Sequence, residues 1–144
     1  MKPDAAAREL KRQAARLVEE LKAAERLSLL DAHSEAVRLS SGTLTEEDLR
    51  RLDHPYATRH GSPRLAPGII NAQSGEFRAG WVARGPTQRG DVIRSTVQNL
   101  APVAKYLEKG TEVMFARPLP ELVEAELAPR RLRRIRAAVE RALK

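Results

Sequence analysis

The chain has 144 residues, which is the length of one domain. It contains no cysteine, so disulfides, thiol nucleophiles, iron–sulfur clusters and cysteine-ligated zinc are excluded. Hydrophobic residues make up 42% and charged residues 31%, and no apolar run approaches the roughly 18 residues of a membrane-spanning helix. The first residues also lack the apolar stretch of a secretory signal. We therefore expect a soluble single domain with one modest core and no membrane contact.

The formal net charge of +7 is concentrated at the end of the chain. Seven of the 26 basic residues, but one of the 19 acidic residues, lie within residues 130–144. A basic face is therefore predicted there. Such a face suits a polyanion, but it also suits solvent or the acidic surface of a neighbouring subunit.

One long helix is predicted from Pro3 to Leu39. Leucine and alanine recur at steps of four and three between Leu10 and Ala24, and Ser40, Ser41 and Gly42 then provide a stop. This apolar stripe is narrow. It fits packing within the domain, and it also fits contact with another subunit.

A shorter helix is expected over residues 46–52, where Thr45 precedes acidic residues of a first turn. Residues 53–75 are rich in proline and glycine and predict a long irregular segment. Strands are predicted over Glu76–Arg84 and Asp91–Asn99, because apolar and polar residues alternate in both. Residues 85–90 contain two glycines and a proline, and are expected to form a hairpin turn between them.

A helix of about two turns is predicted after Pro102 and ends at Gly110. Val113–Phe115 is a candidate for one more short strand. A second long helix starts near Leu119 and should be kinked or split at Pro129. Beyond that proline, one face is apolar and the rest carries the candidate contacts with nucleic acid or an acidic partner, namely Arg130, Arg131, Arg133, Arg134 and Arg136.

The predicted fold class is α+β, with a small antiparallel sheet, a long N-terminal helix and a C-terminal helix kinked near Pro129. The single domain, residues 1–144, divides into four parts. These are an N-terminal helix (1–42), a short helix with a long loop (43–75), a β-rich core with a short helix (76–118) and a basic C-terminal helix (119–144).

Residues suited to catalysis are sparse. His33 is expected at the surface of the first helix, and His54 and His60 are six residues apart, unlike the i, i+4 spacing of helical metal ligands. The scattered glycines form no phosphate-binding loop. Aromatic residues make up 3% of the chain and none lies beside the arginine cluster, which argues against stacking of single strands. We expect no catalysis, no cofactor and no metal.

Two series of short motifs follow one another in the middle of the chain. The first contains His54-Pro55-Tyr56-Ala57, Arg59-His60-Gly61 and residues 69–78, and it ends in Trp81. The second runs from Gln98-Asn99-Leu100-Ala101-Pro102 through Tyr106 to Glu108-Lys109-Gly110-Thr111, and Arg117-Pro118 follows. Over residues 54–128 this succession resembles the tail-completion or head-tail joining (neck) proteins of long-tailed bacteriophages.

The resemblance implies a non-catalytic structural protein with a curved antiparallel sheet. It implies a homo-oligomeric ring of six or twelve copies that joins the capsid connector to the tail tube or tail terminator and lets DNA pass. The protein would then be assembled in the host cytoplasm and located in the neck or tail of the virion, with non-specific contact with phage DNA as a further expectation.

The candidate subunit-interface residues are His54, Tyr56, Arg59, His60, Arg64, Glu108 and Thr111, while a purely intradomain role for the turn at Glu108–Thr111 stays open. The expected core consists of Ile69, Phe77, Trp81, Ile93, Val97, Tyr106, Leu107 and Phe115. The alternative function is a stand-alone nucleic-acid-binding module that uses the basic C-terminal helix.

Overall fold

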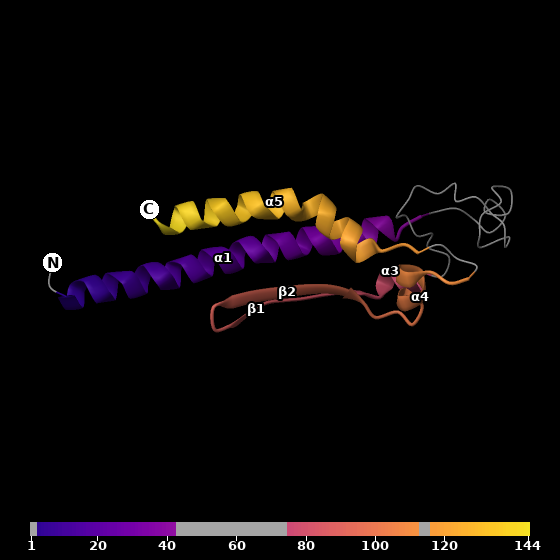
Figure 1. Cartoon of the computed structure of the whole chain (residues 1–144), viewed down its shortest axis with the longest axis horizontal. Helices are drawn as coiled ribbons and strands as arrows, with labels where there is room; N and C mark the ends of the chain where they lie inside the picture. Colours follow the sequence, from indigo (N-terminus) through magenta and orange to yellow (C-terminus); the bar gives the residue numbers. More distant parts are fainter. Residues whose placement is uncertain (1–2, 43–74, 113–115) are drawn as a thin grey trace.

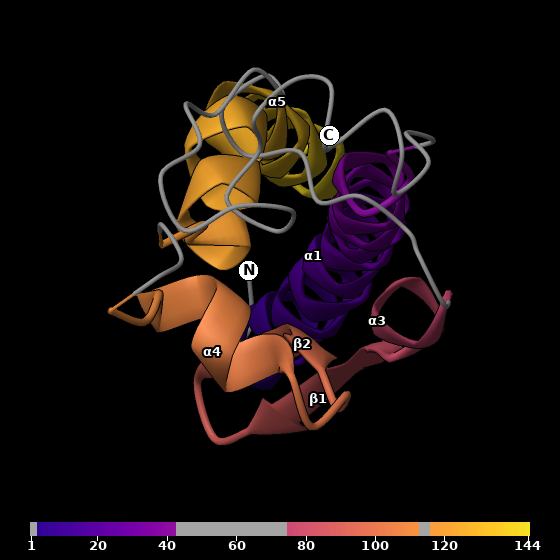
Figure 2. The same cartoon turned by 90° about the vertical axis from the view of Figure 1, so that its right-hand side faces the viewer.

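The computed structural model describes residues 3–42, 75–112 and 116–144. Helix α1 (Pro3–Leu39) and helix α5 (Leu119–Ala142) run side by side in opposite directions, and a hairpin of strands β1 (Trp81–Arg89) and β2 (Val92–Asn99) lies along another side of α1 (Figure 1). The short helices α3 (Glu76–Ala79) and α4 (Ala104–Lys109) stand at one end of the hairpin (Figure 2). The fold is therefore α+β with a small antiparallel sheet, as the sequence predicts.

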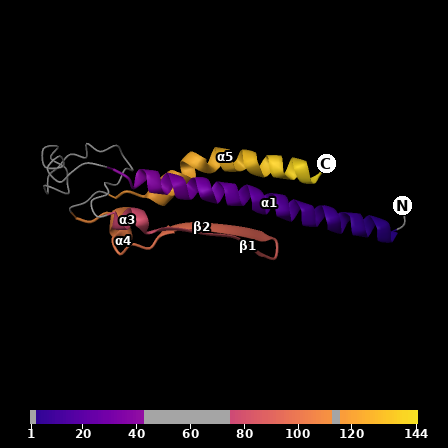
Figure 3. The same cartoon turned by 180° about the vertical axis from the view of Figure 1, so that it is seen from behind.

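Helix α1 ends at Leu39 as predicted. The Ser40 amide donates to the carbonyl oxygens of Ala36 and Val37, and the Ser40 hydroxyl donates to the Ala36 oxygen at 2.7 Å, which satisfies acceptors of the last turn. With 37 residues, α1 is about 55 Å long. Its N-terminal part extends beyond the end of α5 (Figure 3).

The core lies where α1 meets the short helices. Trp81 is 6% exposed, donates from Nε1 to the Ser40 hydroxyl at 2.8 Å and meets the Phe77 ring edge-on. The other buried members of the cluster are Ala36, Leu39, Leu107, Leu119 and Val123. Trp81 and Leu107 are thus confirmed as core, and Phe77 and Val97 pack partly buried against it.

The prediction for Tyr106 is wrong. This side chain is 49% exposed, and the Lys105 Nζ lies 4.8 Å from the centroid of its ring. Helix α4 has only six residues and buries Leu107, so its neighbour Tyr106 projects in another direction. Ile93 is half-buried, while Ile69 and Phe115 lie outside the described residues.

The predicted strand over Glu76–Arg84 is wrong in its first half, because Glu76–Ala79 forms helix α3. Phe77 and Trp81 are four residues apart, a spacing that fits one helical turn as well as alternate strand positions. Gly75 precedes α3 with φ of 76°, a conformation that favours glycine.

The predicted turn over residues 85–90 is also wrong, because β1 continues to Arg89 and the chain reverses after it. Gly85 and Pro86 lie at a bulge, where the register with β2 shifts between Arg84 and Thr87. A bulge tolerates proline, which has no N–H to donate to a neighbouring strand. Strand β2 is confirmed within one residue of its predicted start.

Both predicted helices of the second half are present. Helix α4 ends at Lys109, and the following Gly110 has φ of 75° and donates its amide to the Tyr106 oxygen. Helix α5 continues through Pro129 and changes direction along its length (Figure 1). The expected helix over 46–52, the irregular segment after it and the strand candidate at 113–115 lie outside the described residues.

Asn99 joins the end of the hairpin to α3. Its Nδ2 donates to the Phe77 oxygen at 2.7 Å and its Oδ1 accepts from the Ala101 amide at 2.9 Å. Gly80 lies against this side chain, because a Cβ on Gly80 would be 2.5 Å from the Asn99 Oδ1 and 2.9 Å from the Ala101 nitrogen. The asparagine of the second motif series therefore has a structural role within the chain.

We expect Asn99→Ala to lower the free energy of unfolding by about 1–3 kcal/mol, because it leaves two backbone groups without their partner. Gln98→Ala, at an exposed neighbouring position, is the matched control and should change it by less than about 0.5 kcal/mol. Urea unfolding followed by circular dichroism measures both. Equal effects of the two substitutions would contradict this role of Asn99.

Candidate functional site

The arginines of α5 meet a row of carboxylates on α1. Arg141 donates from Nε to Glu20 at 2.8 Å, and Arg131 donates from Nε and an Nη to both oxygens of Glu25 at 3.0 and 3.1 Å. These ion pairs accompany the most extensive contact between two elements of the fold. Three alanines, Ala24, Ala138 and Ala142, are buried in this part of the helix pair, and such small residues let the helices approach closely.

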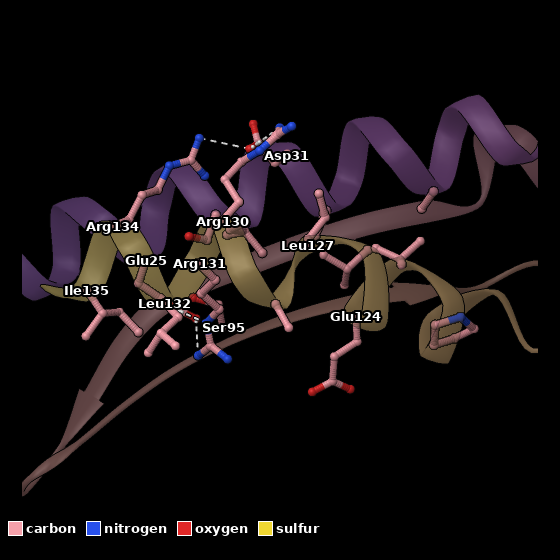
Figure 4. A pocket seen from close by; sticks show the side chains of 18 of the residues that line it. Glu25, Asp31, Ser95, Glu124, Leu127, Arg130, Arg131, Leu132, Arg134 and Ile135 are labelled. Carbon is pink, nitrogen blue, oxygen red and sulfur yellow. Dashed lines mark hydrogen bonds and ion pairs between the residues drawn. The ribbon is translucent and has the colours of Figure 1, made fainter. Parts of the chain in front are cut away.

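Asp31 receives two arginines. The Arg130 Nη1 lies 3.1 Å and the Arg134 Nη2 lies 2.8 Å from its Oδ2 (Figure 4). Burial alone raises the pKa of the Asp31 carboxyl, but the hydrogen bonds and positive charges of the two arginines together outweigh burial and lower this pKa below its ordinary value. Asp31 is therefore held in its charged form at the junction of the two helices.

A further carboxylate, that of Glu35, forms its ion pair within α1. Glu35 accepts from the Arg38 guanidinium, and this hydrogen bond is the largest cause of the lowered pKa of Glu35. Both depressed carboxyl groups lie on the half of α1 that carries the core. Their charged forms stabilise the fold at neutral pH, and this contribution is lost as pH falls through their lowered pKa values.

These ion pairs reduce the number of arginines on the C-terminal helix that are available to a partner. Of the five predicted contact arginines, Arg130, Arg131 and Arg134 pair with carboxylates of the same chain. Arg133 and Arg136 are exposed and form no ion pair with the part of the chain that the structure describes. Sequence reasoning missed Glu20, Glu25 and Asp31 as the partners of this basic face.

A groove of about 440 Å³ opens between α1, α5 and β2 (Figure 4). Its walls are largely apolar and come from all three elements, with Leu29, Val97, Val123, Leu127, Leu132 and Ile135 among them. The Glu25–Arg131 ion pair lies at its border. The Ser95 Oγ, which points into the same region, is buried and has no hydrogen-bond partner among the described residues.

The turn of the second motif series lies beside the core. The Arg117 amide donates to the Leu107 oxygen at 2.7 Å, so the chain after the turn returns to α4. Glu108 is half-buried and faces a second hollow of about 250 Å³, which Arg117 and Asn99 also line. Thr111 is exposed. Two of the candidate interface residues, Glu108 and Thr111, therefore lie at the end of the molecule that carries α4. The other candidates lie outside the described residues, namely His54, Tyr56, Arg59, His60 and Arg64.

His33 is half-buried rather than at the surface. Its Nε2 lies 3.3 Å from the Trp81 oxygen and donates to it, which links α1 to the first residue of β1. The sequence gives no sign of this contact, because it depends on how the hairpin is placed against α1.

No family model, curated protein or solved structure matches this chain. Within residues 3–42, 75–112 and 116–144, no group of three or more histidine, aspartate or glutamate side chains is arranged to hold a metal ion. No helix among the described residues is both long enough and apolar enough to cross a membrane.

We expect Asp31→Asn to lower the free energy of unfolding at pH 7 by about 1 kcal/mol, because it removes the shared partner of Arg130 and Arg134. The difference from the unsubstituted protein should shrink as pH falls through the lowered pKa of Asp31, since protonation removes the same charge. Urea unfolding at pH 7 and at stepwise lower pH measures this.

Glu19→Gln is the matched control for this substitution. Glu19 pairs with Lys22 at 3.1 Å on the exposed surface of α1, and such pairs contribute little. The control should change stability by less than about 0.5 kcal/mol at every pH. A loss for Asp31→Asn that stayed constant at acid pH would show that the charge of Asp31 is not its cause.

Proposed function

We propose that this chain is a non-catalytic bacteriophage structural protein that forms a homo-oligomeric ring at the head-tail interface, joins the capsid connector to the tail and lets DNA pass. The resemblance of residues 54–128 to neck and tail-completion proteins supports this class of protein. The observation that carries the proposal is that Arg117 and Leu107 of the second motif series are hydrogen-bonded to each other beside the core, while large apolar side chains on the two long helices are exposed.

The uncovered surface is extensive for so small a chain. Leu10, Leu30 and Leu132 are 66%, 57% and 49% exposed, and further large apolar side chains are exposed on α5 and the hairpin. The groove between α1, α5 and β2 opens beside Leu132. An apolar groove with an exposed leucine at its wall is a candidate surface for contact between proteins.

The hairpin adds a second reason for assembly. Among the described residues the sheet has two strands, so β1 and β2 each have one edge without a strand partner. Natural proteins cover such edges, and a neighbouring copy is one way to do so. A contact between two different faces of identical subunits repeats around an axis and closes into a ring when the rotation allows it.

The alternative of a stand-alone nucleic-acid-binding module based on the C-terminal helix has less support. It rests on five arginines, of which three pair with Glu25 and Asp31. An arginine that already pairs with a carboxylate neutralises a phosphate only if that pair breaks.

We expect the purified protein to form a closed oligomer, with six or twelve copies, when its native mass is measured by light scattering or native mass spectrometry over a wide range of concentrations. Leu132→Glu should shift the protein toward monomers, because it places a charge at the apolar groove. Leu122→Glu, on an exposed leucine of the same helix that does not line the groove, is the control and should leave the mass unchanged.

A chain that stayed monomeric at every concentration and also failed to join purified connectors or tails would contradict the proposal. Loss of the oligomer with Leu122→Glu but not with Leu132→Glu would contradict the placement of the interface at the groove.

A further inference from the structure

The outer face of the hairpin is a basic surface that the described part of the fold leaves exposed. Val92, Arg94, Thr96 and Gln98 are exposed on β2, whereas the residues that alternate with them are half-buried toward the helices. Arg84 pairs with Thr96 and Arg89 pairs with Val92, so both arginines share the exposed face with Arg94. No other described helix or strand lies along this side of the hairpin (Figures 1 and 2).

The arginines on this face are not engaged by carboxylates of the described residues. Arg84, Arg89 and Arg94 form no ion pair with any residue in the described ranges. The hairpin sequence from Trp81 to Asn99 contains one acidic residue, Asp91, which lies in the turn. The face therefore carries three arginines on a two-stranded antiparallel hairpin without a carboxylate among them.

The basic helix differs in this respect. Four of the arginines on α5 pair with Glu20, Glu25 and Asp31. The remaining two, Arg133 and Arg136, lie on a helix that also carries Glu140 one turn after Arg136. The sequence places the excess positive charge at residues 130–144, but the fold pairs four of the six arginines of α5 and leaves further unpaired positive charge on the hairpin.

We propose that the outer face of the hairpin, with Arg84, Arg89 and Arg94, binds the phosphate backbone of duplex DNA without sequence preference. Arginines neutralise phosphates and release counterions. Two uncharged side chains of the same face, Thr96 and Gln98, supply further hydrogen-bond donors of the kind that position a protein on a phosphate backbone.

The composition of the face favours duplex DNA over other acidic partners. It contains no aromatic residue, so it lacks both the stacking platforms that bind single strands and the aromatic anchors that are enriched at contacts between proteins. The inference goes beyond the proposed function, because a monomer with this face would also bind DNA.

The test compares two double substitutions that each remove two exposed, unpaired arginines. Fluorescence anisotropy measures the affinity of the full chain for a labelled DNA duplex of mixed sequence at several salt concentrations. Arg84→Gln with Arg94→Gln should weaken binding by at least about tenfold near 0.1 M salt and reduce the salt slope by about 2. Arg133→Gln with Arg136→Gln should leave affinity within about twofold and the slope unchanged.

The native mass of each variant is measured on the same samples, because a ring that dissociates would lose affinity through avidity alone. If the hairpin variant also changes in mass, Arg84→Lys with Arg94→Lys keeps the charge and should restore DNA binding in whichever oligomeric state it adopts. Loss of assembly together with retained, salt-dependent binding through the hairpin would contradict the ring and support the DNA-binding face.

Three results would overturn the inference. The first is a lack of duplex binding by the unsubstituted protein at low salt. The second is an equal or larger loss with the α5 variant, which would place the contact on the C-terminal helix. The third is competition by polyglutamate as strong as that by DNA at equal charge, which would identify the face as one for acidic proteins.

Discussion

The contact between α1 and α5 is the constraint on which the rest of the structure depends. Buried alanines at positions 24, 138 and 142 let the two helices approach closely, and ion pairs from Glu20, Glu25 and Asp31 follow the same seam. The core begins where this seam reaches α3 and α4, and Trp81 connects the hairpin to it. One helix pair thus supports a hairpin that has little else to pack against.

The same contact determines which charges are available to a partner. Because α5 lies beside a helix with three suitably placed carboxylates, part of its positive charge is used to hold it on α1 and is no longer free. The hairpin arginines then form a second exposed basic surface, although they contribute little to the uneven distribution of charge along the sequence. Counting charges along the sequence therefore located a basic segment correctly, but it did not show which of the arginines form ion pairs within the chain.

Much of the secondary structure could be predicted from local patterns. The bounds of α1 followed from its apolar spacing and the serines after Leu39, and the change of direction in α5 followed from Pro129. Residues 76–90 were predicted less well, because Phe77 and Trp81 fit either a helix or a strand and Gly85-Pro86 has the composition of a turn. Their conformation is decided by packing against α1 and by the bond from Asn99.

The site was less predictable than the fold. The carboxylates of α1 and the arginines of α5 are each visible in the sequence, but their pairing requires knowing that the helices are antiparallel neighbours. The contact of His33 with the Trp81 oxygen and the groove beside Leu132 depend on the same arrangement. The candidate interface residues between His54 and Arg64 lie outside the described residues and stay predictions.

A double-mutant cycle at the Glu25–Arg131 pair tests most directly whether α5 is held on α1 by its own charges. Glu25→Arg and Arg131→Glu, alone and together, are compared by urea unfolding at one protein concentration. The account predicts that each single reversal destabilises the fold and that the double reversal recovers part of the loss, with a coupling free energy of about 1–2 kcal/mol. Additive losses, with no coupling, would show that the arginines of α5 are not committed to α1 and would contradict the account.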